Sequence, residues 1–387
     1  MKLLVVLSRF PYPLEKGDKL RAYYQLKYLS QNHDIFLVVL NDKKLSECDI
    51  NTVKSFCKEL YVMNLCWWTK LCSIILFFFK GLPLQCGYFY HKKTHKKIRQ
   101  LIKNINPDHI YGQLVRVTEY IKREQYPKTI DYQDVLSKGM ERRVQVAPWY
   151  LKPFFKMEYR RLAQYEAAIF PYFDHHTIIT GVDRDLIPHP DSRNIEVVAN
   201  GVDFEKFKNR DTEKEFDLVF TGNMGYIPNV DAAVFLANVI FPELKKKFPS
   251  LTLVICGANP AIKVKALARK DITVTGWVHD MSQYYAKSRI FVAPMQLGTG
   301  LQNKLLEAMA SGIPCVTSAL AGKPLENIRQ AKEIMICNTL TGYIDAISVL
   351  LTNQALYLEI AQNGQHFVKE NYNWETTTKK LEKILQK

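Results

Sequence analysis

The chain has 387 residues, of which 47% are hydrophobic and 24% are charged, a composition typical of a globular protein that is long enough for two domains. The formal net charge of +15 predicts an anionic partner. The eight cysteines form no CxxC pair and no zinc spacing, so they argue against a disulfide scaffold and indicate reduced thiols in a cytoplasmic protein.

The first half alternates between apolar runs and segments with helical spacing. The N-terminal apolar stretch is short and lacks a small-residue cleavage site, so we expect a first buried strand rather than a signal peptide. The same patterns continue along the chain. We expect strands over 3–7, 35–40, 109–111, 129–132 and 177–180, and helices over 18–31 and 144–170.

A basic stretch covers residues 51–103, which hold ten Lys or Arg and one acidic residue, Glu59. Within it, the apolar run 71–79 follows two tryptophans and is flanked by lysines. The run is about half as long as a membrane span, and it suits a segment lying among anionic lipid headgroups. A buried helix is the alternative. Nucleic acid is not expected, because the aromatic residues do not interleave with the charges.

His91 and His95 are four residues apart in this stretch and could share one helical face. Lysines surround them and would repel a metal ion. We therefore expect a solvated basic face here, and we predict no metal site and no cofactor.

The second half repeats the alternation after a break at 183–217 that is rich in Pro and Asp. Strand–helix alternation predicts a parallel sheet covered by helices, and its repetition predicts two Rossmann-like α/β domains facing across a cleft. Ligands of such sheets bind at the carboxyl ends of strands. We expect strands over 217–221, 251–256, 272–275, 290–293 and 315–317, and helices over 231–248, 281–286 and 301–311.

The segment 296–318 carries the strongest functional signal. Gly298 and Gly300 open a helix whose free N–H groups and dipole suit a phosphate. Lys304 and Glu307 project from one face of that helix, where the lysine adds positive charge and the carboxylate can accept hydrogen bonds from sugar hydroxyls. These parts predict a site for a nucleoside diphosphate and its ribose. The alternative is an ordinary surface ion pair.

Three further positions follow predicted strands. Gly17 ends the loop after the first strand, beside Asp18 as a possible helix cap. Gly222 would let a ligand approach the backbone closely. Asp131 and Asp134 stand at the end of a first-half strand, a common place for chemistry. Plain turns are the alternative in each case.

Segment 298–318 resembles the donor-binding signature of retaining GT-B glycosyltransferases that build bacterial polysaccharide and lipopolysaccharide. Four more segments resemble that family in the same order, and the resemblance covers nearly the whole chain. They are 197–203 near the domain junction, 220–229 at the start of the donor domain, 274–278 at the nucleotide base and 371–374 at the last helix. The segments 9–18 and 81–84 are similar to an exopolysaccharide-associated subgroup.

The chain departs from the family pattern at three places. Thr299 replaces the first of two glutamates, so Glu307 stands as the second. Asn223 and Asn229 stand near the usual Arg/Lys pair, which leaves Lys304 as the cation for the diphosphate. Gln133 and Asp134 align near a histidine that contacts the donor sugar.

The resemblance implies a hexosyltransferase that transfers a sugar from a nucleoside diphosphate sugar to a glycan or lipid-linked acceptor, with retention and without a metal. It implies an acceptor-side domain at 1–202, a donor domain at 203–368 and a helix at 369–387 returning to the first domain. A cytoplasmic enzyme peripheral to the inner face of an anionic membrane is expected. An inactive membrane assembly subunit and a nucleotide-sugar epimerase are the alternatives. The implied catalytic residues are Lys304, Glu307 and Asp134, and the donor-binding residues are Gly17, Gly222, Asn223, Trp277, Val278, Thr299, Gly300, Leu301 and Asn303.

Overall fold

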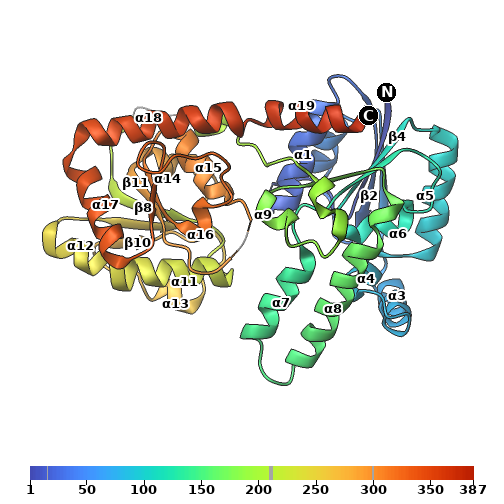
Figure 1. Ribbon diagram of the computed structural model, residues 1–387, viewed down its shortest axis with the longest axis horizontal. Helices are drawn as coiled ribbons and strands as arrows, with labels where there is room; N and C mark the ends of the chain where they lie inside the picture. Colours follow the sequence, from blue (N-terminus) through green and yellow to red (C-terminus); the bar gives the residue numbers. More distant parts are fainter. Residues whose placement is uncertain (15, 209–211, 299) are drawn as a thin grey trace. The chain divides into compact units, whose positions relative to one another are not determined.

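The computed structural model describes residues 1–14, 16–208, 212–298 and 300–387. The chain divides into two compact units. Unit 1 comprises Met1–Ala199 and Thr377–Lys387, and unit 2 comprises Asn200–Thr376. Each unit is built around its own parallel sheet (Figure 1).

Unit 1 contains a seven-stranded sheet in the order β3-β2-β1-β4-β5-β6-β7, with every pair parallel. The strands are β1 (Lys2–Leu7), β2 (Asp34–Asn41), β3 (Glu59–Asn64), β4 (His109–Gln113), β5 (Lys128–Asp131), β6 (His175–Ile178) and β7 (Glu196–Val197). The main helices are α1 (Gly17–Leu29), α2 (Glu47–Lys54), α3 (Trp67–Phe79), α4 (Leu84–Phe89), α5 (Lys92–Ile105), α6 (Thr118–Ile121), α7 (Leu136–Val146), α8 (Lys152–Ala168) and α9 (Gly181–Arg184).

Alternating side chains of the central strands build two separate cores, because successive residues of a strand point to opposite faces. On one face, Leu4 and Val6 pack with α4, α5 and α8. On the other face, Leu3 and Val5 pack with α1 and with the last helix, α19 (Trp374–Leu385). Leu381 and Leu385 of α19 are buried in this second core, so the C-terminal helix contacts α1 as the resemblance implied.

Unit 2 contains a six-stranded parallel sheet in the order β10-β9-β8-β11-β12-β13. The strands are β8 (Phe216–Thr221), β9 (Leu253–Cys256), β10 (Ile272–Val274), β11 (Ser288–Ala293), β12 (Cys315–Ser318) and β13 (Met335–Cys337). The helices include α10 (Phe204–Phe207), α11 (Ile227–Phe235), α12 (Phe241–Lys247), α13 (Ile262–Lys265), α14 (Ser282–Ala286), α15 (Asn303–Ala310), α16 (Ala319–Gly322), α17 (Leu340–Thr352) and α18 (Gln354–Asn371).

A π-helical turn, Leu236–Ile240, joins α11 to α12 in one long apolar helix. Its span Ile227–Lys247 is the one stretch of described helix that is long and apolar enough to cross a membrane, and half of its 18-residue apolar stretch is buried. Leu236, Ile240 and Phe241 are fully buried. We interpret this segment as a core helix of unit 2.

Most predicted elements form, with shifted ends. The strand expected at 177–180 is His175–Ile178, and the helix expected over 144–170 is split into α7 and α8 around Pro148. Three strands were not predicted: β3, which is only half-buried and forms a weak apolar run, the two-residue β7, and the three-residue β13. The predicted break at 183–217 contains β7, which completes the first sheet.

Candidate donor site

The loop before α15 lies at the carboxyl end of β11 in unit 2. Gly298 and Gly300 have positive φ angles of 122° and 75°, a conformation that favours glycine. The helix begins at Asn303, so the expectation that the two glycines open it directly was wrong; they shape the loop instead. Gln302 is the N-cap and makes no side-chain capping bond, so the first turn of α15 keeps unsatisfied N–H donors. Thr299 lies outside the described residues.

Lys304 is partly buried in the first turn of α15. Its Nζ donates to the Asn229 side-chain oxygen, lies 3.6 Å from Met295 Sδ and stands 4.8 Å from the centre of the Phe220 ring. Among the described residues, no carboxylate forms an ion pair with it. Burial lowers the pKa of Lys304 to about 7. The attraction to Glu307 offsets only part of the effect of burial, so the Lys304 amine is poised between its charged and neutral forms.

Glu307 lies one turn further along α15. Its Oε2 accepts a hydrogen bond of 3.0 Å from the Tyr285 hydroxyl, which also lies 2.7 Å from Thr221 Oγ1. Burial raises the pKa of Glu307 to about 7. Glu307 does not pair with Lys304, so the surface ion-pair alternative is wrong, and a carboxylate poised between its charged and neutral forms remains.

The turn after β8 positions the partner of Lys304. Gly222 has a φ of 150°, and a Cβ there would approach Asn229 Nδ2 to 2.7 Å. Asn229 Nδ2 donates to the Asn223 carbonyl at 3.0 Å, and Asn223 Oδ1 accepts from the Gly225 amide at 3.0 Å. Asn223 and Asn229 thus replace the expected cation pair with a neutral amide network that aims one oxygen at Lys304.

The remaining donor-binding candidates of unit 2 lie at the start of α15, in the loop before it and after β10. Asn303 Oδ1 accepts a hydrogen bond of 3.2 Å from Asn200 Nδ2. Leu301 is partly buried in the loop before α15. Trp277 is 68% exposed after β10, beside the partly buried Val278. An exposed indole at a loop tip offers a free ring face to a base.

In unit 1, Gly17 is the first residue of α1 rather than the end of its preceding loop. Asp18 is not the cap: it pairs with Arg9 at 2.7 Å, while Lys16 occupies the cap position without a capping bond. Asp134 follows β5, where desolvation and then the nearby Asp183 raise its pKa to about 6.

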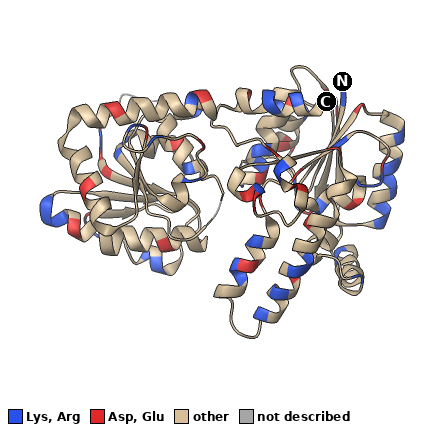
Figure 2. Ribbon diagram, in the orientation of Figure 1, with Lys and Arg blue, Asp and Glu red and all other residues tan. Residues whose placement is uncertain are grey.

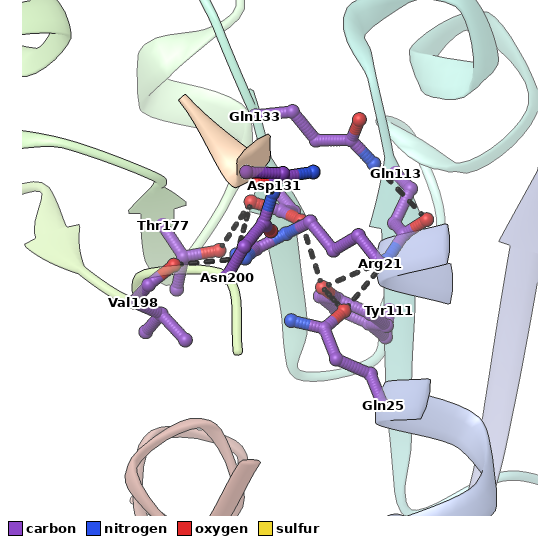
Figure 3. A network of polar contacts seen from close by, with 10 residues as sticks. Arg21, Gln25, Tyr111, Gln113, Asp131, Gln133, Thr177, Val198 and Asn200 are labelled. Carbon is purple, nitrogen blue, oxygen red and sulfur yellow. Dashed lines mark hydrogen bonds and ion pairs between the residues drawn. The ribbon is translucent and has the colours of Figure 1, made fainter. Parts of the chain in front are cut away.

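Asp131 is the centre of a buried network that sequence reasoning missed (Figure 3). Its two oxygens accept from Arg21 Nε and Nη2 at 2.7 and 3.1 Å. Thr177 Oγ1 and the Tyr111 hydroxyl donate to it at 3.0 Å each. Arg21 also donates to the Val198 carbonyl at 2.8 Å. With every oxygen engaged and no exposed surface, Asp131 fixes α1 against the sheet.

No group of three or more His, Cys, Asp or Glu side chains suited to a metal ion occurs within the described part of the chain. His91 bonds to Thr94 at 2.9 Å, and His95 lies 3.2 Å from the Tyr90 hydroxyl. Desolvation and then neighbouring cations lower the pKa of His91. These two residues thus have local partners.

Residues 215–353 match a family described as Glycosyl transferases group 1. An uncharacterised 44.6 kDa protein from the cps region of Klebsiella pneumoniae is 24% identical over 96% of both chains. The Escherichia coli UDP-Gal:alpha-D-GlcNAc-diphosphoundecaprenol alpha-1,3-galactosyltransferase is 24% identical over 50% of this chain and 54% of that protein.

Solved structures share the fold over the whole chain. TarM has a TM-score of 0.71 at 11% identity, covering 100% of this chain and 99% of that one. WaaG, described as a glycosyltransferase involved in lipopolysaccharide biosynthesis, has a TM-score of 0.66 at 14% identity, covering 99% of each chain. Anabaena Alr3699/HepE in complex with UDP and glucose has a TM-score of 0.69 at 13% identity, covering 100% of each chain.

Residues 215–353 therefore resemble the group 1 glycosyltransferases, and the chain has the GT-B fold of these solved structures. The predicted fold class and enzyme class are therefore confirmed.

Proposed function

We propose that this glycosyltransferase binds the diphosphate of its donor at the first turn of α15 and transfers a hexose, with retention, to a glycan or lipid-linked acceptor. The observation that supports it most is the Lys304 amine, which is desolvated and, within the described ranges, forms hydrogen bonds only to an amide oxygen and a sulfur. A buried cation without a counter-charge is costly unless an anion joins it. A diphosphate supplies that anion.

The reaction breaks the bond between the sugar and the diphosphate, and the negative charge on the leaving oxygen grows. Preorganised donors stabilise such a charge in the transition state. Here they are Lys304 Nζ and the uncapped amides at the start of α15. Gly300 lets the preceding backbone approach the phosphates. Glu307, held by Tyr285, is the proposed acceptor for the ribose hydroxyls.

Asp134 and the amide of Gly17 are proposed to act from unit 1. A carboxyl with a raised pKa at the end of a strand can exchange a proton near neutral pH. Gly17 begins a helix without a side-chain cap and so presents free N–H groups. The exposed Trp277 is the proposed platform for the base, with Val278, Leu301, Asn303 and Asn223 lining the donor site.

We further propose a role in cell-surface polysaccharide synthesis at the inner face of the membrane. The cps-region relative supports the pathway, since it matches nearly the whole chain. The exposed side chains of two helices support the location: α3 exposes Trp67, Trp68 and Phe79, and α5 exposes Lys92, Lys93, Lys96 and Lys97. The ribbon of α5 carries several blue segments in Figure 2, which mark its Lys and Arg residues. One groove of about 840 Å³ is lined by both helices. Aromatic and basic neighbours suit the interface of an anionic bilayer.

A transfer assay tests the proposal. The purified chain is incubated with a panel of radiolabelled UDP-, GDP- and dTDP-hexoses and lipid-linked acceptors, and the products are separated and their anomeric linkage determined. A labelled product that retains the donor's anomeric configuration supports the proposal. Conversion of the donor without an acceptor would indicate an epimerase. Absence of transfer with each tested donor and a complete set of acceptors would favour the inactive assembly subunit.

A further inference from the structure

A pocket of about 760 Å³ lies entirely within unit 1, between the β1–α1 loop, the β2–α2 loop, α4 and the α7–α8 pair. The lining contains seven basic residues and three acidic ones. Two of the acidic residues are already engaged. Asp42 accepts from Lys70 at 3.0 Å and from Tyr88 at 2.7 Å, and Glu158 accepts the Leu84 and Gln85 amides. The lining therefore carries a formal excess of four positive charges, and one of its cations, Arg9, is paired with Asp18 outside the lining. The basic residues are Arg9, Lys16, Lys19, Lys43, Lys44, Arg116 and Arg143.

Arg116 is the least satisfied of these cations. Its Nη2 donates to Gln85 Oε1 at 3.0 Å, but its buried Nε has no hydrogen-bond partner, and neither has the buried Gln85 Nε2. In the described ranges no carboxylate lies within ion-pair distance of Arg116. Desolvation, followed by the nearby Arg9, lowers the pKa of Arg116. A guanidinium in this state needs an anion.

The surrounding rings orient the guanidinium groups. Phe89 is buried, with Arg116 at 5.4 Å and Arg9 at 5.9 Å from its ring centre, so one ring holds both cations by cation–π contact. A planar guanidinium binds phosphate oxygens in pairs, which makes arginine the usual residue for that anion.

The pocket also has an apolar rim. Ile74 of α3 and Phe154 of α8 both line it. They belong to the two helices of unit 1 that expose large apolar side chains, and Phe154 itself is 48% exposed. The helices touch, since the Arg161 guanidinium lies 4.9 Å from the Phe78 ring centre. An anion with an apolar tail would place its head among the cations and its tail along this rim.

We propose that this pocket binds a phosphate or diphosphate group of a lipid-linked acceptor, with Arg116 and Gln85 as the recognition pair. This proposal rests on the proposed function in one respect, since the bound lipid is an acceptor only if the protein transfers a sugar to it. A free anion and the donor's own diphosphate share this chemistry, so the experiment separates all three sources.

Calorimetry on the full chain, saturated with UDP or with GDP, measures binding of inorganic pyrophosphate and of farnesyl diphosphate. We expect both to bind the nucleotide-loaded chain, farnesyl diphosphate more tightly. Arg116→Gln should weaken both by about 10- to 100-fold, because it removes a charged hydrogen-bond donor. Arg193→Gln, at an exposed arginine outside the pocket lining, should match the wild type.

Gln85→Glu gives the sharper test, because it places a carboxylate at the 3.0 Å contact with Arg116. It should leave the melting temperature unchanged or raised while abolishing pyrophosphate binding. If Gln85 and Arg116 had only a structural role, a variant that is as stable as the wild type would still bind pyrophosphate.

Wild-type binding by both Arg116→Gln and Gln85→Glu would overturn the proposal. So would pyrophosphate that competes with nucleotide, which would assign the anion to the donor, or equal affinities of the two probes, which would assign it to a free anion. Pyrophosphate binding does not depend on turnover, so failure of the transfer assay alone would overturn the proposed function and leave this site standing.

Discussion

Lys304 and Glu307 lie one turn apart on α15, yet their side chains do not pair. Lys304 turns to the amide oxygen of Asn229, and Glu307 turns to the hydroxyl of Tyr285. Burial moves the pKa of each group toward its neutral form, and the attraction between the two side chains offsets only part of that shift. This arrangement costs stability in the free protein and leaves both groups available to a ligand.

Donor binding should depend on pH through Lys304. Burial lowers its pKa from the ordinary 10.5 to about 7, so above that pH a bound diphosphate must draw a proton onto the amine. Nucleoside diphosphate affinity should fall as the pH rises from about 7 to about 9. Calorimetry in buffers of different ionisation enthalpy should show proton uptake on binding at about pH 8. Equal uptake by Lys304→Met would assign the proton to another group.

Glu307→Gln should raise stability and weaken donor binding. The folded carboxyl has a pKa of about 7 and the unfolded one about 4.5, so its contribution to stability falls as pH rises between these values and stays low above them. The glutamine keeps an acceptor for Tyr285 and carries no charge. At about pH 8 its free energy of unfolding should exceed that of the wild type by about 1–3 kcal/mol, which raises the melting temperature. At about pH 4 the two proteins should have the same melting temperature. An equal gain at both pH values would exclude titration as the cause.

The same variant should bind a nucleoside diphosphate about tenfold more weakly, because a neutral amide is a poorer acceptor for ribose hydroxyls than a carboxylate. Calorimetry with UDP and GDP gives the affinities. Unaltered affinity would remove Glu307 from the donor site.

Gly222→Ala should weaken donor binding through Asn229. The new Cβ would approach Asn229 Nδ2 to 2.7 Å and displace the side chain that holds Lys304. Gly81→Ala is the matched control, since Gly81 of unit 1 also has a positive φ, of 68°, but a Cβ there meets nothing within 4 Å. Both variants carry backbone strain of about 1 kcal/mol. Only Gly222→Ala should lower nucleotide affinity beyond what its stability loss explains; equal affinities would refute the link.

Membrane association should need both α3 and α5. Flotation with anionic vesicles at low salt should recover the wild type, and high salt should release it. Replacing Lys93, Lys96 and Lys97 by glutamine should remove about 1 kcal/mol of attraction per residue. A double replacement of Lys263 and Lys265, exposed on α13 of unit 2, is the charge control. Recovery that is equal with neutral vesicles would contradict the electrostatic part.

The sequence predicted the two parallel sheets because buried strands are continuous apolar runs, such as 3–7 and 35–40. It did not predict β3, β7 or β13, since half-buried strands and strands of two or three residues leave little pattern. The segment around Lys304 was found from its glycines and charge spacing. The partners Asn229 and Tyr285 were not assigned to these charges, because their contacts join residues 75 and 22 positions apart in the chain.

The pairing of Arg21 with Asp131 was missed for the same reason, across 110 positions. The position of Asp131 at a strand end suggests a catalytic role in the sequence. Its four hydrogen bonds indicate a structural role instead. Arg116 left no signal in the sequence, because what distinguishes it is a buried Nε that has no hydrogen-bond partner among the described residues.

Calorimetric titration of UDP and GDP into the wild type and Lys304→Met is the most direct test of the donor site. Methionine fills the space without a buried charge, so the variant should be at least as stable as the wild type while its nucleotide affinity falls by about 10- to 100-fold. A Lys323→Met control, at an exposed lysine of the same unit, should bind normally. A stable Lys304→Met protein that binds both nucleotides as tightly as the wild type would contradict the account.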